Sequence, residues 1–227
     1  MTPPDSGNRN AGERRAGRHA VSRALALFLG GFTLLNVLGG IRYPHFDANL
    51  WWIDLRRLPA VASGGILVVS SVLLIAYGVR PARRSWRRRL TAGFVALLAC
   101  VTVWNGVRFY VLLAQGAIRT SFPVPFSFFV AAALLVVLLG VGKAAPGRTD
   151  GRERVVWACT LAGCMAGFPL AQMVCFGKTD YRRPADAVVV FGARVYASGL
   201  LSHALRDRLR TACDLYEEGL APKLILS

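Results

Sequence analysis

Five apolar stretches, each about as long as a bilayer crossing requires, constrain the fold of this chain more than any other feature. They cover residues 20–41, 58–79, 90–114, 125–142 and 155–176. The hydrocarbon core of a bilayer is about 30 Å thick and a helix rises 1.5 Å per residue, so roughly 20 apolar residues suffice for one crossing. The fourth stretch is the shortest and begins at a proline, which the first position of a helix tolerates. The sequence therefore predicts a membrane α-helical bundle of about five transmembrane helices over residues 20–176.

The composition agrees with a membrane protein and argues against a nucleic-acid-binding one. Hydrophobic residues make up 54% of the chain, yet its formal net charge is +16. The basic residues stand between the apolar stretches and do not line one face, as a nucleic-acid surface would require. We therefore expect the lipid bilayer as a partner, and no nucleic acid.

The connections between the apolar stretches differ in basic residues, and this difference predicts an orientation. Five arginines lie in the first 23 residues, and the second and fourth connections hold six and four basic residues, against four in the first and third together. Short loops rich in Lys and Arg stay in the cytoplasm. We expect a multi-pass protein of the cytoplasmic (inner) membrane, with a basic cytoplasmic tail over residues 1–19 and an extracytoplasmic C-terminal domain.

Polar residues within or beside the predicted spans suggest few sites. Arg108 is the single ionisable candidate inside a span, and its side chain either extends to the outer headgroups or is a buried functional arginine. We expect no acidic residue inside a span. His45, Asp47 and Asp54 in the first outer connection could suggest a metal, but their spacing matches no familiar ligand pattern, so we interpret this connection as an interfacial turn and predict no metal site.

The last part of the chain has a different pattern, typical of a soluble domain. After a linker over residues 177–184, residues 185–227 begin with a β-branched run that indicates a buried strand. One helical stripe follows, formed by Leu201, Leu205, Leu209, Ala212 and Tyr216. Ser202 can cap this helix and Gly219 can end it before a second apolar run. This order predicts a βαβ unit with parallel strands, the start of an α/β Rossmann-like domain.

These residues resemble the YdcF/SanA/ElyC family, a bacterial domain of unknown function. The family pattern falls on Asp186, Gly192, Gly199, Ser202, Arg208 with Leu209, Tyr216, Gly219, Pro222 and Ser227. Leu201 departs from it, since a proline usually stands before the helix serine. The match covers about one fifth of the chain, and the sequence stops at the first residue of the family's Ser-Gly-Gly. The resemblance therefore implies an incomplete domain, from a truncated product or a fragment.

The resemblance also implies a location and a role. Members of this family are commonly tethered to the membrane with the domain on its outer side, and some are linked to envelope or peptidoglycan biogenesis. We therefore expect a role in cell-envelope biogenesis, with a phosphate-bearing or lipid-linked envelope ligand as partner.

The candidate ligand site lies at the turn between the first strand and the helix. A glycine turn at a helix N-terminus favours an anion. We predict Asp186, Gly192, Arg194, Ser202 and Arg208 as ligand-binding residues. Arg208 either reaches the ligand or covers the core with its stem. The sequence assigns no cofactor and no catalytic residue.

Two classes of function stay open at this point. The first is an envelope-biogenesis protein whose outer domain binds or processes an anionic ligand. The second is a non-catalytic membrane scaffold or transporter-associated subunit, in which the terminal domain only contacts partners.

Overall fold

The computed structural model describes residues 6–43, 46–47, 52–80, 84–141 and 151–227. The chain divides into two compact units. The first comprises residues 1–112 and 120–179, and the second comprises residues 113–119 and 180–227.

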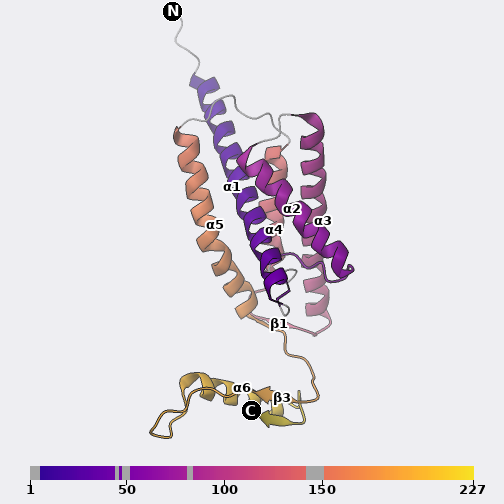
Figure 1. The fold of residues 1–227 in the computed structure, drawn as a ribbon, viewed down its shortest axis with the longest axis vertical. Coiled ribbons are helices and arrows are strands. Elements are labelled where there is room, and N and C mark those ends of the chain that lie inside the picture. The colour runs from indigo at the N-terminus through magenta and orange to yellow at the C-terminus, as the bar shows by residue number, and fades with distance from the viewer. Residues whose placement is uncertain (1–5, 44–45, 48–51, 81–83, 142–150) are drawn as a thin grey trace, which may run out of the picture. The chain divides into compact units, whose positions relative to one another are not determined.

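Helices dominate the first unit (Figure 1). Their bounds are α1 (Ser6–Arg42), α2 (Ala60–Val79), α3 (Ser85–Ala114), α4 (Phe126–Val141) and α5 (Gly151–Gly177). Among the described residues, α1 from Ala16, α2, α3 and α5 are each long and apolar enough to cross a membrane. The prediction of a helical membrane bundle is therefore confirmed, and the chain is a multi-pass membrane protein.

The helix α4 differs from the other four in length. It has 16 residues, which corresponds to about 24 Å at 1.5 Å per residue. It nevertheless lies where the fourth apolar stretch predicts it, except that residue 142 is outside the described residues. A crossing of the membrane by α4 stays a prediction.

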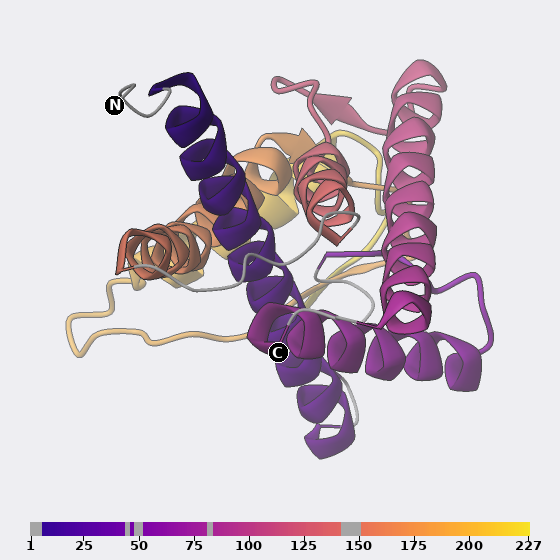
Figure 2. The same ribbon diagram turned by 90° about the horizontal axis from the view of Figure 1, so that it is seen from above.

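The helix α1 packs against α2, α4 and α5 (Figures 1 and 2). Two glycines bring α1 and α2 into close contact. A Cβ atom on Gly30 of α1 would lie 2.9 Å from Leu74 Cβ, and one on Gly78 of α2 would lie 2.8 Å from Leu27 Cβ. Small residues allow the backbones of membrane helices to approach closely. Each of these two helices therefore has a glycine at a point of close contact with the other.

The core of the bundle includes part of a connection as well as helices. Leu29, Leu67, Leu74, Leu98 and Leu134 are almost completely buried. Trp52, Ile53 and Leu55, which precede α2 in the chain, belong to the same apolar cluster. The connection before α2 therefore packs onto the helices, and it is more than an interfacial turn.

A carboxylate and two arginines lie near this connection. Arg56 donates to Asp54 through Nε at 3.0 Å and through Nη2 at 2.9 Å. The hydrogen bond from Arg56 holds the pKa of Asp54 below its ordinary value, and the charge of the half-buried Arg108 acts in the same direction. Arg108 is therefore within electrostatic reach of Asp54 in this connection. His45 lies outside the described residues, within which no three His, Cys, Asp or Glu side chains gather as metal ligands.

The second unit contains the predicted strand, helix and strand. They are β3 (Val188–Val190), α6 (His203–Glu217) and β4 (Leu224–Leu226), while two shorter strands, β1 (Arg119–Thr120) and β2 (Thr179–Asp180), pair with each other. The strands β3 and β4 are parallel, with Val189 opposite Ile225. The βαβ order and the parallel pairing are confirmed.

The second unit begins earlier than the predicted domain. Arg182 donates to Asp180 at 2.8 Å and to Glu218 at 2.9 Å, and the Ala185 N–H donates to the Leu220 carbonyl at 2.8 Å. The hydrogen bond from Arg182 holds the pKa of Asp180 below its ordinary value. Part of the segment predicted as a linker is therefore fixed to the end of α6.

Candidate functional site

The segment between β3 and α6 is a closed loop with its own hydrogen bonds. Val195 and Leu201 form an antiparallel bridge, and the turn between them has Gly199 at a φ of +77°, a value that glycine adopts without strain. The Ser202 N–H donates to the Arg194 carbonyl at 3.0 Å. The Ser202 side chain accepts a hydrogen bond from the Leu205 N–H at 3.3 Å, which confirms the predicted cap of α6.

Arg208 extends from α6 to the carboxyl end of β3. Its Nη1 donates to the Phe191 carbonyl at 3.1 Å and to the Gly192 carbonyl at 3.2 Å. The guanidinium therefore lies at the predicted turn. An arginine has five N–H donors, and among the described residues no acceptor contacts the Nε and Nη2 groups of Arg208.

Gly192 takes part in the pairing of the two strands. Its N–H donates to the Ser227 carbonyl at 2.9 Å, so the pairing of β3 with β4 continues past Val190. A Cβ atom at Gly192 would lie 3.0 Å from the same carbonyl oxygen. Gly192 thus allows the strands to pair closely, and its N–H is not free for a ligand.

The structure brings some of the predicted ligand-binding residues together and separates others. Gly192 and Arg208 are in contact, and Ser202 is tied to Arg194 through the backbone. The guanidinium of Arg194 lies over the Tyr196 ring, 5.6 Å from its centroid. Asp186 precedes β3, at the opposite end of the strand from Gly192, and six extended residues span roughly 20 Å. Asp186 therefore lies apart from the other four.

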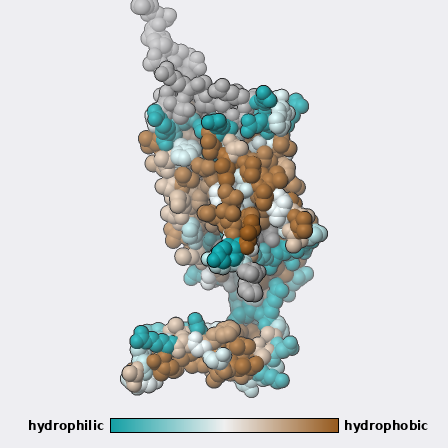
Figure 3. All heavy atoms as spheres, viewed as in Figure 1, coloured by the Kyte–Doolittle hydropathy of each residue, from teal (hydrophilic) through white to brown (hydrophobic). Residues whose placement is uncertain are grey.

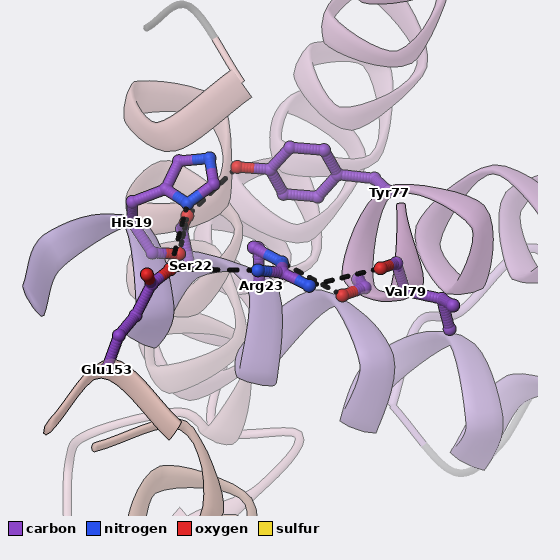
Figure 4. A network of polar contacts seen from close by, with 7 residues as sticks. His19, Ser22, Arg23, Tyr77, Val79 and Glu153 are labelled. Atoms are coloured by element: carbon purple, nitrogen blue, oxygen red, sulfur yellow. Dashed lines mark hydrogen bonds and ion pairs between the residues drawn. The ribbon is translucent and has the colours of Figure 1, made fainter. Parts of the chain in front are cut away.

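Sequence reasoning missed a buried polar cluster where α1, α2 and α5 meet (Figure 4). It consists of His19, Ser22 and Arg23 from α1, Tyr77 from α2 and Glu153 from α5. His19, Ser22, Tyr77 and Glu153 are each at most 6% exposed. An ionisable residue inside a membrane bundle is costly and is a functional candidate by default.

Hydrogen bonds connect α1 to α2 within the cluster. Ser22 Oγ and Tyr77 Oη are 2.9 Å apart, and Ser22 also donates to the His19 carbonyl at 3.0 Å. Arg23 donates through Nε to the Gly78 carbonyl at 3.1 Å and through Nη2 to the Val79 carbonyl at 3.0 Å. Arg23 thus satisfies two carbonyls at the carboxyl end of α2, where the last carbonyls of a helix lack partners within the helix.

Glu153 joins α5 to the cluster by charge. Its Oε1 lies 3.7 Å from His19 Nδ1 and 3.7 Å from Arg23 Nη1. This separation is too long for hydrogen bonds, and neither Oε1 nor Nδ1 has a hydrogen-bond partner among the described residues. Oε1 is therefore held by electrostatic attraction and not by a hydrogen bond, in a place from which water is largely excluded.

Two differences between expectation and structure explain why the cluster was missed. The predicted spans begin at residues 20 and 155, whereas α1 begins at Ser6 and α5 at Gly151. Glu153 is therefore the third residue of a long apolar helix, and it lies before the predicted span of residues 155–176, in the first turn of α5. The sequence contained one signal of the cluster. The polar residues 19, 22 and 23 would share one face of a helix that continued before residue 20.

An apolar cavity of about 270 Å³ lies between α1, α4 and α5. Its lining residues include Phe28 of α1, Phe129 of α4 and the pair Gly163 and Gly167 of α5. A Cβ atom on either glycine would meet no other atom within 4 Å. The missing side chains at these two positions therefore help to keep the cavity open.

Comparison with known proteins adds no relative to this description. No family model, no curated protein and no solved structure matches the chain. The resemblance to the YdcF/SanA/ElyC family therefore depends on the residues of the second unit alone.

Proposed function

We propose that this multi-pass protein of the cytoplasmic membrane acts in cell-envelope biogenesis and binds a phosphate-bearing ligand at its second unit. In this proposal the second unit is the beginning of a Rossmann-like domain of the YdcF/SanA/ElyC type and lies on the extracytoplasmic side. The ligand is a lipid-linked or otherwise phosphorylated precursor of the envelope.

One observation carries the proposal, namely the position of the Arg208 guanidinium at the carboxyl end of β3. In α/β proteins, ligands bind at the carboxyl ends of parallel strands. Two carbonyls fix Nη1, which leaves two other nitrogens of the same planar group to donate to a phosphate in parallel. The amino end of α6 is in the same region of the unit, and its dipole favours an anion.

The first prediction concerns Arg208. Arg208→Gln should weaken binding of a polyisoprenyl phosphate or inorganic pyrophosphate by about 10- to 100-fold, because hydrogen bonds to charged groups contribute about 1.5–3 kcal/mol. Binding would be measured by calorimetry on the full chain in detergent. Arg210→Gln is the matched control, since Arg210 is exposed two residues further along the same helix and points to another side.

Two outcomes would count against the site. One is equal affinity of wild type and Arg208→Gln for both probes, and the other is an equal loss in Arg210→Gln, which would indicate a response to net charge alone. Gly192→Val is unsuitable as a test, because the valine would press against the Ser227 carbonyl.

The exposed strands favour a second candidate function. All three residues of β4 are exposed, and Phe191 and Leu226 are 68% and 69% exposed. Exposed apolar surface of this kind often marks a contact with another protein. A non-catalytic membrane scaffold or transporter-associated subunit would use this surface. It becomes the better candidate if Arg208→Gln leaves phosphate binding and envelope integrity unchanged.

The second prediction concerns the orientation. A reporter active only in the periplasm should be active when fused after Gly199, and inactive when fused at Gly147, which lies outside the described residues. The basic connections before α3 and before α5 provide the reason, because such loops stay in the cytoplasm. If α4 does not cross the membrane, the two fusions will report the reverse pattern, with Gly147 outside and Gly199 inside, and the extracytoplasmic placement of the second unit would then be wrong.

A further inference from the structure

The amino end of α3 is a strongly basic surface. Arg84, Arg87, Arg88 and Arg89 lie within six residues, together with Trp86. Arg84, Arg87 and Arg89 are exposed, Arg88 is half-buried, and the Trp86 ring is 57% exposed. We call these five residues the basic end of α3. Figure 3 shows hydrophilic side chains gathered at the end of the bundle where α3 begins, next to the apolar middle.

No acidic side chain neutralises this surface within the described part of the chain. The guanidinium groups of the four arginines have no salt bridge and no hydrogen bond to these described residues. The first turn of α3 contains no Asp or Glu, and its free N–H groups and dipole add positive potential. The buried Glu153 is held by His19 and Arg23. The basic end therefore presents several positive charges to whatever lies beside it.

Along α3, these charges lie at the level expected for lipid headgroups. Leu90 begins the apolar stretch, and Thr91 is the first buried residue of the helix. At 100° per residue, Arg87 and Arg88 lie on the same side as Thr91, whereas Trp86 and Arg89 lie on the opposite side. The charges therefore surround the end of the helix directly beyond its hydrocarbon-spanning part. A tryptophan at this level is typical of the membrane interface.

We propose that the basic end of α3 is a binding surface for anionic phospholipids. The planar guanidinium group matches the geometry of a phosphate and binds it with two parallel hydrogen bonds. Clusters of four or more basic residues next to a membrane helix attract anionic headgroups. A zwitterionic phospholipid carries an ammonium group that opposes this attraction, so the surface selects headgroups with a net negative charge. This surface is separate in sequence from Arg208 and needs no ligand at the second unit.

The test uses the full chain in detergent micelles. Binding of phosphatidylglycerol and of phosphatidylcholine would be followed by native mass spectrometry for wild type and for the triple variant Arg84→Gln/Arg87→Gln/Arg89→Gln. We expect the triple variant to bind phosphatidylglycerol about 100-fold more weakly, from about 1 kcal/mol per arginine, and phosphatidylcholine as before. The matched control is Arg183→Gln/Arg206→Gln/Arg210→Gln, which removes the same charge from exposed positions of the second unit.

The control variant should retain wild-type affinity for phosphatidylglycerol. Helix content from circular dichroism would verify that each variant is folded. If the triple variant does not fold, the Arg87→Gln single variant would be tested in its place. Undiminished phosphatidylglycerol binding in the folded variant of the basic end would overturn the inference. An equal loss in the control variant, or equal affinity of wild type for the two lipids, would overturn it as well.

Discussion

Glu153→Ala should lower the free energy of unfolding by about 3–5 kcal/mol, which is the usual cost of removing one partner of a buried ion pair. The Glu153 side chain is 3% exposed, and its carboxylate lies 3.7 Å from both His19 Nδ1 and Arg23 Nη1. Without it, the Arg23 charge would stay largely buried beside α5 with only the Gly78 and Val79 carbonyls as acceptors. Unfolding of the full chain in mixed micelles with increasing denaturing detergent would measure the difference.

Two further variants show whether the cost comes from an uncompensated charge. Glu217→Ala removes an exposed carboxylate and should change stability by less than about 0.5 kcal/mol. The double variant Arg23→Met/Glu153→Met replaces both charges by apolar side chains, and it should be more stable than Glu153→Ala, because a well-packed apolar pair often replaces a buried ion pair without loss. If Glu153→Ala and Glu217→Ala lower the free energy of unfolding by equally small amounts, the ion pair does not hold α5 in place.

The helices could be predicted from the sequence because one physical requirement selects them. A span must be apolar over the thickness of the bilayer, and the five apolar stretches coincide with α1 to α5 to within a few residues, apart from extensions at the amino ends of α1, α3 and α5. The extensions were not predicted, since a helix continues as long as its backbone can bond, whether or not its side chains are apolar. Hydropathy marks the part of a helix in hydrocarbon and leaves the ends of the helix undetermined.

The polar cluster could not be predicted, because His19 and Glu153 lie at the helix ends that hydropathy leaves undetermined. His19 and Glu153 are 134 positions apart in the sequence, and each stands beside arginines that suggest an exposed loop. Their proximity results from the packing of α1 against α5, which no pattern within either segment specifies. The buried face of α2 includes Ser63 and Ser71 and was equally hidden, because a polar hydroxyl in a span can donate to a carbonyl of its own helix, as both do.

In the second unit the pattern predicted the elements better than the roles of single residues. The β-branched run, the apolar stripe and the serine cap correspond to β3, α6 and its first turn. The sequence allowed two positions for the Arg208 side chain. At the edge of the stripe, a long side chain can either reach a ligand or cover the core. The sequence did not show how far the ladder of β3 and β4 extends. In the structure the ladder continues to the hydrogen bond between Gly192 and Ser227.

Gly140→Leu should separate α4 from α1 and α2, with a loss of about 1–3 kcal/mol or more in stability from overpacking. Gly140 is buried near the carboxyl end of α4. A Cβ atom there would lie 2.9 Å from Tyr77 Oη and would overlap the Ser22 side chain. Ser22 and Tyr77 cannot both move away without breaking their 2.9 Å contact and the Ser22 bond to the His19 carbonyl. The substitution therefore costs packing and buried hydrogen bonds together, and the thermal midpoint of the full chain in detergent should fall.

The matched control is Gly93→Leu in α3, where an added Cβ atom meets nothing within 4 Å and the backbone is exposed. Leucine has a higher helix propensity than glycine by up to about 1 kcal/mol, so this control should be neutral or slightly stabilising. Both variants add the same side chain to an apolar helix, and they differ only in what surrounds the glycine. Equal midpoints for the two variants would mean that α4 does not pack against Ser22 and Tyr77 as described. A fall confined to Gly140→Leu would locate a close helix contact of the bundle at the buried polar cluster.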